Sequence, residues 1–321
     1  MNGEIDLTNT TTADQWFEEL EKSNKIEVLK TNIESKAIKN LPDFPVHLDI
    51  EITGRCNLMC LQCFRFSRRT DIGDMKFSLF EKVINESIKY KKPSINLSWL
   101  GEPFLHSQVI KMMKFANQRG IENIWLYTNG ILVDEKMAYE VLESGLKYIV
   151  FSIDAVSKEE YSNTKIGSDL DLVRKNIENL ITFKKKINPS LNVFIQILYN
   201  NQNEQEIKTF INDWQDKVDM IRITLLQKPD GSYSMSSRKY EIFPCSQLWE
   251  RLVIAWDGTV YACTGDNACR TPLENIKNID LYRIWHSDLL NMLRQQHLNF
   301  EANKLEACQF CDFNKVNRKI I

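Results

Sequence analysis

The chain has 321 residues, a formal net charge of −2 and an apolar content of 43%. This length fits one large domain, or one domain with a small appendage. The near-neutral charge excludes a strongly basic protein that binds nucleic acid or an anionic membrane surface, and no segment reaches the roughly 20 apolar residues that a membrane helix needs.

Eight cysteines stand out in this composition. The first residues lack a basic stretch followed by an apolar core, so we expect no signal peptide. Without an export signal, this many cysteines indicates metal or redox chemistry rather than disulfides. We therefore expect a cytosolic, oxygen-sensitive protein with reduced thiols, which binds neither nucleic acid nor a membrane.

The chain begins with a polar extension over residues 1–44, in which a helix is predicted from Ala13 to Ser23. From Val46 onward, strand-like and helical patterns alternate, which predicts βαβ units, a parallel sheet and right-handed crossovers. We expect an α/β fold, a curved sheet or partial barrel of six strands with active groups at the carboxyl ends of the strands. The strands are predicted to start near Val46, Ile95, Ile124, Tyr148, Val193 and Ile221, and the helices to span 78–90, 108–119, 134–144, 170–186 and 203–215.

Three cysteines, Cys56, Cys60 and Cys63, follow the first predicted strand within eight residues. A tight loop with three thiolates suits an iron–sulfur cluster. Structural zinc takes four protein ligands, and no further His or Cys is near in sequence to complete the set. Three ligands on a cluster of four irons leave one iron open to a substrate or cofactor. The alternative interpretation is three unrelated reduced thiols.

Polar residues end several later strands. Gly101 removes a side chain where a backbone could approach a ligand, and Glu102 places a carboxylate that could accept from an ammonium group. Thr128 and Asn129 precede a glycine and could simply shape a turn. Glu102 could likewise be part of an ordinary turn.

Ser152 and Asp154 share one face of the fourth predicted strand, which is extended to Asp154, and together could bind a ribose diol. Asp154 could instead cap the following loop. Gln196 is a polar group on the fifth strand, either a structural amide or a cofactor contact. Lys228 follows the sixth strand near the barrel mouth, as a solvated lysine or a catalytic base.

A second cysteine set lies near the end of the chain. Cys245 precedes a predicted hairpin over 252–263, whose Asp-Gly turn is a strong hairpin signal and which ends in Cys263. A single amphipathic helix is predicted from Leu281 to His297, followed by Cys308 and Cys311. Four thiolates could hold either structural zinc or an iron–sulfur cluster.

The spacing Cys-x3-Cys-x2-Cys after a first strand resembles that of radical S-adenosylmethionine (radical SAM) enzymes. The resemblance implies a partial (β/α)6 barrel in which SAM chelates the open iron of a [4Fe-4S] cluster. It also implies that Gly101 and Glu102 hold the SAM amino group and that Ser152 and Asp154 bind its ribose, with Thr128 and Asn129 lining the SAM or substrate pocket. Leu100 stands at the first glycine of the family's Gly-Gly-Glu motif, so the chain departs from the motif at that position.

The second set resembles the SPASM/twitch extension of the same family, in its shorter form with one auxiliary [4Fe-4S] cluster. The resemblance implies a small α+β domain and two clusters in all, held by Cys56, Cys60, Cys63, Cys245, Cys263, Cys308 and Cys311. We expect an N-terminal helical extension over 1–44, a radical SAM partial barrel over 45–230 and a twitch-type domain over 231–321. Cys269 is left over, as a spare thiol, an alternative ligand or a hydrogen-atom donor.

The four-cysteine pattern is similar to that of the 2-deoxy-scyllo-inosamine dehydrogenase family, which oxidises a secondary alcohol. This similarity implies dehydrogenation, with Lys228 as base, or epimerisation, with Cys269 as hydrogen donor, of a carbinol carbon in a sugar-like or aminocyclitol-like small molecule. A one-electron donor such as flavodoxin or ferredoxin is the expected partner. A peptide or protein maturase is the second hypothesis, and a non-enzymatic zinc or scaffold protein is the third.

Overall fold

The computed structural model describes residues 20, 22–29, 40–67, 72–200, 203–226, 240–242, 244–266, 269–309, 311 and 315–317. The helix predicted over 13–23 therefore lies almost wholly outside the described residues. Within these ranges, no helix is both long and apolar enough to cross a membrane.

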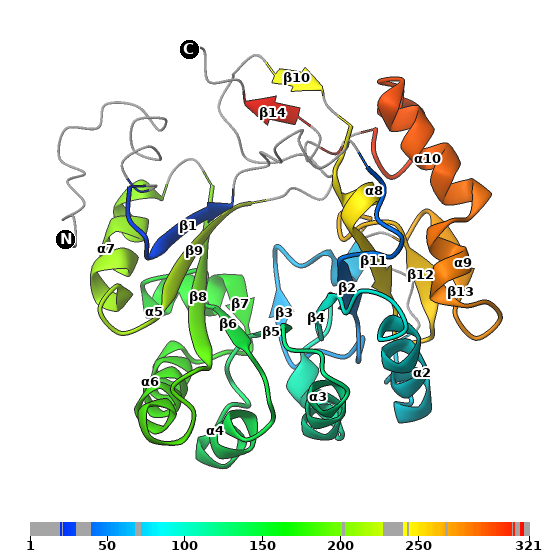
Figure 1. The fold of residues 1–321 in the computed structure, drawn as a ribbon. Helices are drawn as coiled ribbons and strands as arrows, with labels where there is room; N and C mark the ends of the chain where they lie inside the picture. Colours follow the sequence, from blue (N-terminus) through cyan, green and yellow to red (C-terminus); the bar gives the residue numbers. More distant parts are fainter. Residues whose placement is uncertain are drawn as a thin grey trace.

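Six parallel strands form the centre of a curved sheet (Figure 1). Their order along the sheet follows the order in the chain, and helices cover the outer face, which confirms the predicted partial (β/α)6 barrel. The strands are β2 (His47–Ile50), β4 (Ser94–Asn96), β5 (Ile124–Thr128), β6 (Tyr148–Ser152), β8 (Asn192–Tyr199) and β9 (Met220–Leu225). The covering helices are α2 (Phe77–Ser87), α3 (Val109–Gln118), α4 (Glu135–Leu142), α6 (Leu170–Ile187) and α7 (Glu204–Trp214).

The alternation of side chains along the strands explains this layering. In β5, Ile124 and Leu126 are fully buried, whereas Trp125 and Tyr127, which alternate with them, are half-buried and line the interior. The facing helices present apolar stripes at helical spacing, such as Val173 and Ile177 on α6. Each strand thus has an apolar face toward the helices and a more polar face toward the barrel interior, where chemistry can take place.

The sheet extends beyond these six strands at both edges, and among the described residues it has ten strands. Strand β1 (Ile26–Leu29) lies parallel to β9, within the extension for which only a helix was predicted. At the other edge, β11 (Arg251–Ile254) lies parallel to β2, and β12 (Thr259–Tyr261) and β13 (Pro272–Asn275) follow in antiparallel order. The predicted hairpin is therefore continuous with the barrel sheet.

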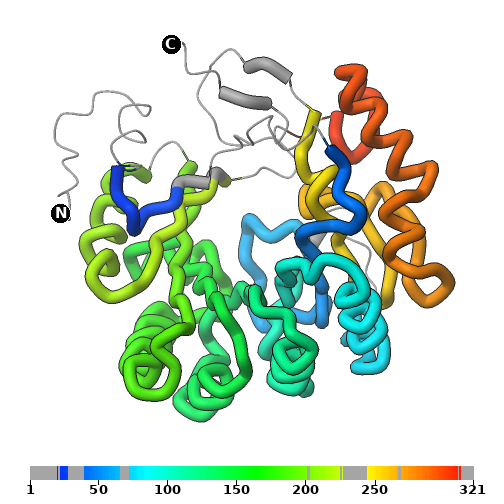
Figure 2. The backbone as a smooth tube through the Cα atoms, in the orientation of Figure 1, coloured from blue at the N-terminus to red at the C-terminus, as the bar shows by residue number. Residues whose placement is uncertain are grey.

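The segment after β2 runs inside the arc of strands (Figure 2). It contains β3 (Met59–Cys60), which pairs with β7 (Lys165–Ile166) after helix α5 (Lys158–Thr164). The remaining described elements are the 3-10 helices η2 (Phe64–Ser67), η3 (Pro103–Leu105) and η4 (Ala302–Lys304), helix α8 (Gln247–Glu250), and the pair β10 (Tyr240–Ile242) and β14 (Lys315–Asn317).

The helix predicted over 281–297 is wrong as a single element. Two helices, α9 (Leu281–Trp285) and α10 (Asp288–Leu298), replace it. Ser287 causes the break, because its hydroxyl accepts a hydrogen bond from the Leu290 amide at 3.3 Å and caps α10. The indole nitrogen of Trp285 donates to the Pro42 carbonyl at 2.8 Å, which fastens α9 to the chain just before β2.

The continuity of β11 with β2 makes a prediction about stability. Ile254 is fully buried, its carbonyl accepts from the Glu51 amide at 2.8 Å, and it lies opposite Ile50. Ile254→Ala should lower the free energy of unfolding of the metal-free chain by about 2–5 kcal/mol, within one cooperative transition followed by circular dichroism in urea. Met292→Ala, at a side chain that is 46% exposed, is the control. A separate early transition for the hairpin would contradict this.

Candidate active site

The loop with the first three cysteines is fixed at its start by an ion pair. Asp74 accepts from Arg55 Nε at 2.9 Å and from Nη2 at 2.7 Å, and from the Thr53 hydroxyl at 2.7 Å. Burial acts to raise the pKa of Asp74, but the hydrogen bonds from Thr53 and Arg55 outweigh it, so the pKa is lowered. The residues just before Cys56 are thus held by a bidentate ion pair.

Gly101 lies directly against this loop. A Cβ added there would lie 2.0 Å from the carbonyl oxygen of Thr53 and 2.8 Å from that of Arg55. The next amide, that of Glu102, donates to the Arg55 carbonyl at 2.7 Å. The group that approaches Gly101 is therefore the backbone of the cysteine loop, where the sequence predicts a ligand.

The carboxylate of Glu102 connects the end of β4 to the end of β5. It accepts from the Thr128 hydroxyl and the Asn129 amide, both at 2.8 Å, and from the Phe104 amide at 3.2 Å. Burial raises the pKa of Glu102 to about 7, although these hydrogen bonds act to lower it. Asn129 Nδ2 also donates to Asn57 Oδ1 at 2.8 Å. The predicted residues Glu102, Thr128 and Asn129 thus lie together, beside the cysteine loop.

The end of β6 differs from the prediction. The strand stops at Ser152, two residues before the predicted end, and Asp154 takes a left-handed conformation with φ 62°. The Gln196 carbonyl accepts from the amides of Ile153 and Asp154, at 3.0 and 3.2 Å, which holds this turn. Asp154 Oδ2 lies 2.9 Å from Lys165 Nζ, while Oδ1 is buried without a hydrogen-bond partner. One carboxylate oxygen of Asp154 is therefore available to a ligand.

The three thiols of the first set influence one another electrostatically. Burial, together with the thiols of Cys63 and Cys56, raises the pKa of Cys60 to about 11, although Lys165 acts to lower it. The pKa of Cys56 is likewise raised, first by burial and also by Cys63. Such thiols hold their protons until a metal displaces them, so iron binding here releases protons.

The thiols of the second set are partly buried, as those of the first set are, and they too influence one another. Burial, then the neighbouring thiol of Cys311, raises the pKa of Cys263 to about 12. The pKa values of Cys245 and Cys308 are also raised by burial and by the other thiols of the set. The Cys245 amide donates to His297 Nδ1 at 3.1 Å, and burial lowers the pKa of His297 to about 4, so that the ring stays neutral and accepts.

The thiols of each set lie near one another. They influence each other's pKa within both sets, and a Cβ added at Gly265 would lie 3.8 Å from the sulfur of Cys263 and 3.9 Å from that of Cys311. Thiolates are the ligands that hold iron–sulfur clusters, so the chemistry of both donor sets fits such a group.

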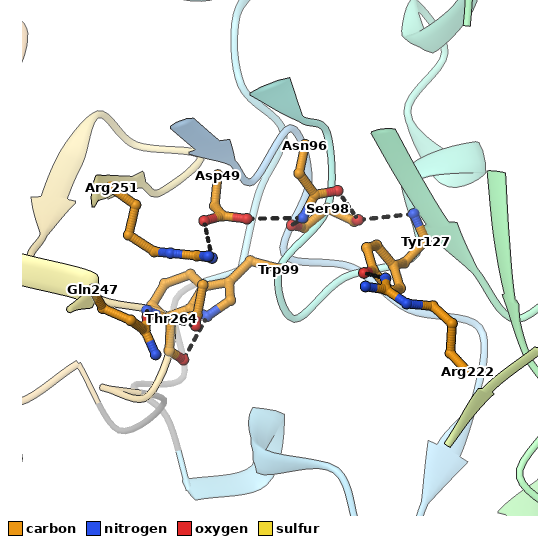
Figure 3. Close-up of polar contacts among 9 residues, drawn as sticks. All are labelled: Asp49, Asn96, Ser98, Trp99, Tyr127, Arg222, Gln247, Arg251 and Thr264. Atoms are coloured by element: carbon orange, nitrogen blue, oxygen red, sulfur yellow. Dashed lines mark hydrogen bonds and ion pairs between the residues drawn. The ribbon is translucent and has the colours of Figure 1, made fainter. Parts of the chain in front are cut away.

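A polar network lies inside the barrel (Figure 3). Asp49 accepts from Asn96 Nδ2 at 3.0 Å and from Arg251 Nη1 at 3.1 Å. On the opposite wall, Arg222 donates to the Tyr127 hydroxyl. These residues line a cavity of about 190 Å³. The interior is therefore suited to a small, hydrogen-bonding molecule.

The second cysteine set is tied to the end of β4 by Trp99, which the sequence did not single out (Figure 3). Its indole nitrogen donates to the carbonyl of Thr264 at 3.2 Å, and Thr264 follows Cys263 directly. The Thr264 amide and hydroxyl donate to Gln247 Oε1 at 3.1 and 3.0 Å. Cys269, with φ 55°, packs beside Trp99 against the small apolar cluster around Tyr261. Lys228 lies outside the described residues.

Two parts of the chain match known protein families. Residues 50–213, about half of the chain, match the Radical SAM superfamily. The chain belongs to the radical SAM superfamily. Residues 245–312 match SPASM, an iron–sulfur cluster-binding domain. These matches imply SAM and a [4Fe-4S] cluster in the barrel and further iron–sulfur binding in the C-terminal part, as the motifs predict.

Solved structures share the fold at low sequence identity. BtrN in complex with AdoMet and 2-DOIA has a TM-score of 0.59 and 17% identity, covering 85% of this chain and 94% of BtrN. Streptococcus suis SuiB bound to the precursor peptide SuiA has a TM-score of 0.61 and 15% identity, covering 92% of this chain and 75% of SuiB. The enzyme anSMEcpe with AdoMet and Cp18Cys peptide has a TM-score of 0.59 and 16% identity, covering 84% and 89%.

Curated relatives match over only part of their length. The tungsten-containing aldehyde ferredoxin oxidoreductase cofactor-modifying protein of Pyrococcus furiosus is 27% identical over 162 residues, 49% of this chain and 45% of that protein. The GTP 3′,8-cyclase of Clostridium perfringens is 30% identical over 195 residues, 58% and 57% of the two chains. The chain thus spans about half the length of these relatives.

The contact at Gly101 predicts a strong effect of a small change. Gly101→Ala should push the end of β4 away from the cysteine loop, because its Cβ would overlap two carbonyl oxygens. We expect a loss of about 1–3 kcal/mol or more in the free energy of unfolding of the metal-free chain, measured by urea denaturation. Gly265→Ala, whose Cβ would find its nearest neighbour 3.8 Å away, should be nearly neutral in the same assay. Equal effects of the two variants would contradict the close contact.

Proposed function

We propose that the chain oxidises or epimerises a carbinol carbon of a small sugar-like or aminocyclitol-like molecule. The observation that carries this proposal is the second set of four thiols, Cys245, Cys263, Cys308 and Cys311, set beside strands that continue the barrel sheet. When bound, SAM and the two clusters supply a radical that removes hydrogen from a substrate and a second centre that accepts an electron. The reducing partner in this proposal is a one-electron donor of the flavodoxin or ferredoxin class.

Residues of this chain would place SAM against the cysteine loop. The Glu102 carboxylate lies beside Asn57 of the loop through Asn129 and is the acceptor proposed for the SAM amino group. The unpartnered Oδ1 of Asp154 is the acceptor proposed for the ribose, with Ser152 beside it. Gln196 supports that position through its carbonyl. These contacts would orient the reacting atom and exclude water, which is the protein's part in cofactor chemistry.

The interior supports a small polar substrate. A cavity of about 190 Å³ is smaller than the roughly 300–1,000 Å³ of pockets for drug-sized ligands. Its lining offers both donors and acceptors, among them Arg222, Asn96 and Asp49, and the indole of Trp125. A single hydroxylated ring matches this size and polarity. The likeness to BtrN, a 2-deoxy-scyllo-inosamine dehydrogenase whose chain is 94% covered, supports the same class.

A peptide or protein maturase is the second candidate function. The likeness to SuiB with its precursor peptide and to anSMEcpe with a peptide favours it. The match covers 94% of BtrN but only 75% of SuiB, and this supports the small-molecule hypothesis. Peptide libraries assayed beside sugars would separate the two, because only one class should increase the formation of 5′-deoxyadenosine.

The reaction type can be tested with labelled substrates. Sugars and aminocyclitols deuterated at one carbinol carbon should pass deuterium to 5′-deoxyadenosine in the anaerobically reconstituted enzyme with SAM and dithionite, followed by mass spectrometry. A carbonyl product indicates dehydrogenation, and an epimer that gains deuterium from D2O indicates epimerisation. No transfer from any carbinol carbon in the panel, with transfer from a peptide, would refute the proposal in favour of the maturase.

Two cysteine variants sharpen that test. Cys245→Ser should remove about half of the iron, because it breaks one of two four-iron sites, and Cys269→Ser should leave the iron content unchanged. In a dehydrogenase, Cys269→Ser keeps the product distribution and Cys245→Ser loses the carbonyl product. In an epimerase, Cys269→Ser loses the epimer. Loss of iron in Cys269→Ser would instead identify it as a ligand.

The titration of Glu102 predicts how SAM binding depends on pH. Since burial raises the pKa of Glu102 to about 7, and the proposed contact needs the carboxylate, SAM affinity should fall up to about tenfold per pH unit as the pH drops below about 7. Glu102→Gln should weaken binding and flatten this dependence, measured by equilibrium dialysis of cluster-loaded protein between about pH 5.5 and 7. Glu159→Gln on α5 is the control. An unchanged profile in Glu102→Gln would speak against the contact.

A further inference from the structure

A short ladder fastens the cysteine loop to the segment after β6. In the antiparallel pair of β3 and β7, Cys60 lies opposite Lys165 and Met59 lies opposite Ile166. The amide of Leu61 also donates to the Thr164 carbonyl at 3.0 Å. The middle cysteine of the first set is thus held by backbone hydrogen bonds to a part of the chain about one hundred residues away.

The side chain of Lys165 is buried below this ladder. It is 4% exposed, and its ammonium lies 2.9 Å from Asp154 Oδ2 and donates to the Ser152 carbonyl. The Tyr161 ring closes the site from another side, 6.0 Å from the ammonium. Lysine is rarely buried unless it is paired, and Asp154 takes the left-handed conformation, with φ 62°, which is uncommon for residues other than glycine.

This positive charge lies near the ligands of the first cluster. Directly opposite residues in an antiparallel pair have their Cβ atoms about 4.5–5.5 Å apart on the same face. Cys60 and Lys165 are such a pair, so the side chain of Lys165 begins beside a ligand of the first cluster. Its ammonium group, paired with Asp154, is buried at the same site. In a buried site such charges are little screened by water.

We propose that Lys165 is a positioning residue of the first cluster, which fastens the Cys60 segment and whose buried positive charge raises the cluster's reduction potential. An electron added to a cluster increases its negative charge, so a fixed cation beside a ligand stabilises the reduced form more than the oxidised form. A higher potential eases electron entry from the external donor. The inference rests on membership of the radical SAM superfamily, and it is independent of the substrate class proposed above.

Reduction potentials of variants test this proposal. Lys165→Met keeps the aliphatic stem and removes the charge, and Lys165→Arg keeps the charge. Electron paramagnetic resonance of reconstituted holoenzyme, poised at fixed potentials, would measure the reduced fraction of the first cluster. SAM binds the open iron of that cluster, so the signal that SAM alters is assigned to it. Lys165→Met should lower the ratio of reduced to oxidised cluster at least tenfold, which is 59 mV for one electron, and Lys165→Arg should stay within threefold.

Lys158→Met is the matched control, because it makes the same change in the same segment at a side chain that is 71% exposed. It should leave the potential unchanged. A ratio within threefold of the unmodified protein in Lys165→Met would overturn the proposal, even if iron content or thermal stability falls, since a purely structural lysine affects those alone. If Lys165→Met does not hold a cluster, Lys165→Gln, which also removes the charge, takes its place in the same measurement. A reduced-to-oxidised ratio at least tenfold lower supports the proposal, and a ratio within threefold overturns it.

Discussion

The backbone contact between the end of β4 and the cysteine loop determines how the rest of the site is arranged. Gly101 has no Cβ, so the carbonyl groups of Thr53 and Arg55 can lie against it, and the next amide donates to one of them. Because this contact is made by main-chain atoms, it leaves the Glu102 side chain free to turn toward the end of β5. A single glycine therefore places an acidic group and a thiol-bearing loop next to each other.

Two ionisable side chains in this region, Glu102 and Lys165, are buried, and burial affects the protonation of each. Glu102 is surrounded by three donors and still has its pKa raised to about 7, so the loss of water is the dominant cause. Lys165 is as deeply buried and stays charged, since it is paired with Asp154. A carboxyl group with a pKa near 7 and a charged lysine thus lie on two sides of the same loop. A cationic ligand such as SAM would meet the first, and a cluster that gains negative charge would meet the second.

The sequence predicts the site through residues that act by identity and spacing. Three cysteines at intervals of four and three, and a glutamate at the end of a strand, need no knowledge of distant contacts. Lys165 carries no such signal, because it lies in a polar stretch and gains its surroundings only when β7 pairs with β3. Asp154 was predicted on the strand face, and its left-handed turn depends on the carbonyl of Gln196 across the sheet. Long-range hydrogen bonds cannot be recognised from the local sequence, and they account for the differences between the predicted and observed surroundings of these two residues.

The same limit applies to the relation between the two cysteine sets. A hairpin can be predicted from its Asp-Gly turn. The strand with which it pairs cannot be predicted, since any exposed strand edge offers the same unpaired backbone N–H and C=O groups. Here β11 attaches to β2, the strand that leads into Cys56, and β12 leads into Cys263. Trp99 then hydrogen-bonds the residue after Cys263 from the end of β4. Two separate constraints, a strand ladder and an indole contact, therefore connect the second set to the strands that hold the first. A C-terminal part attached in this way keeps a fixed position relative to the barrel strands that lead into the first set.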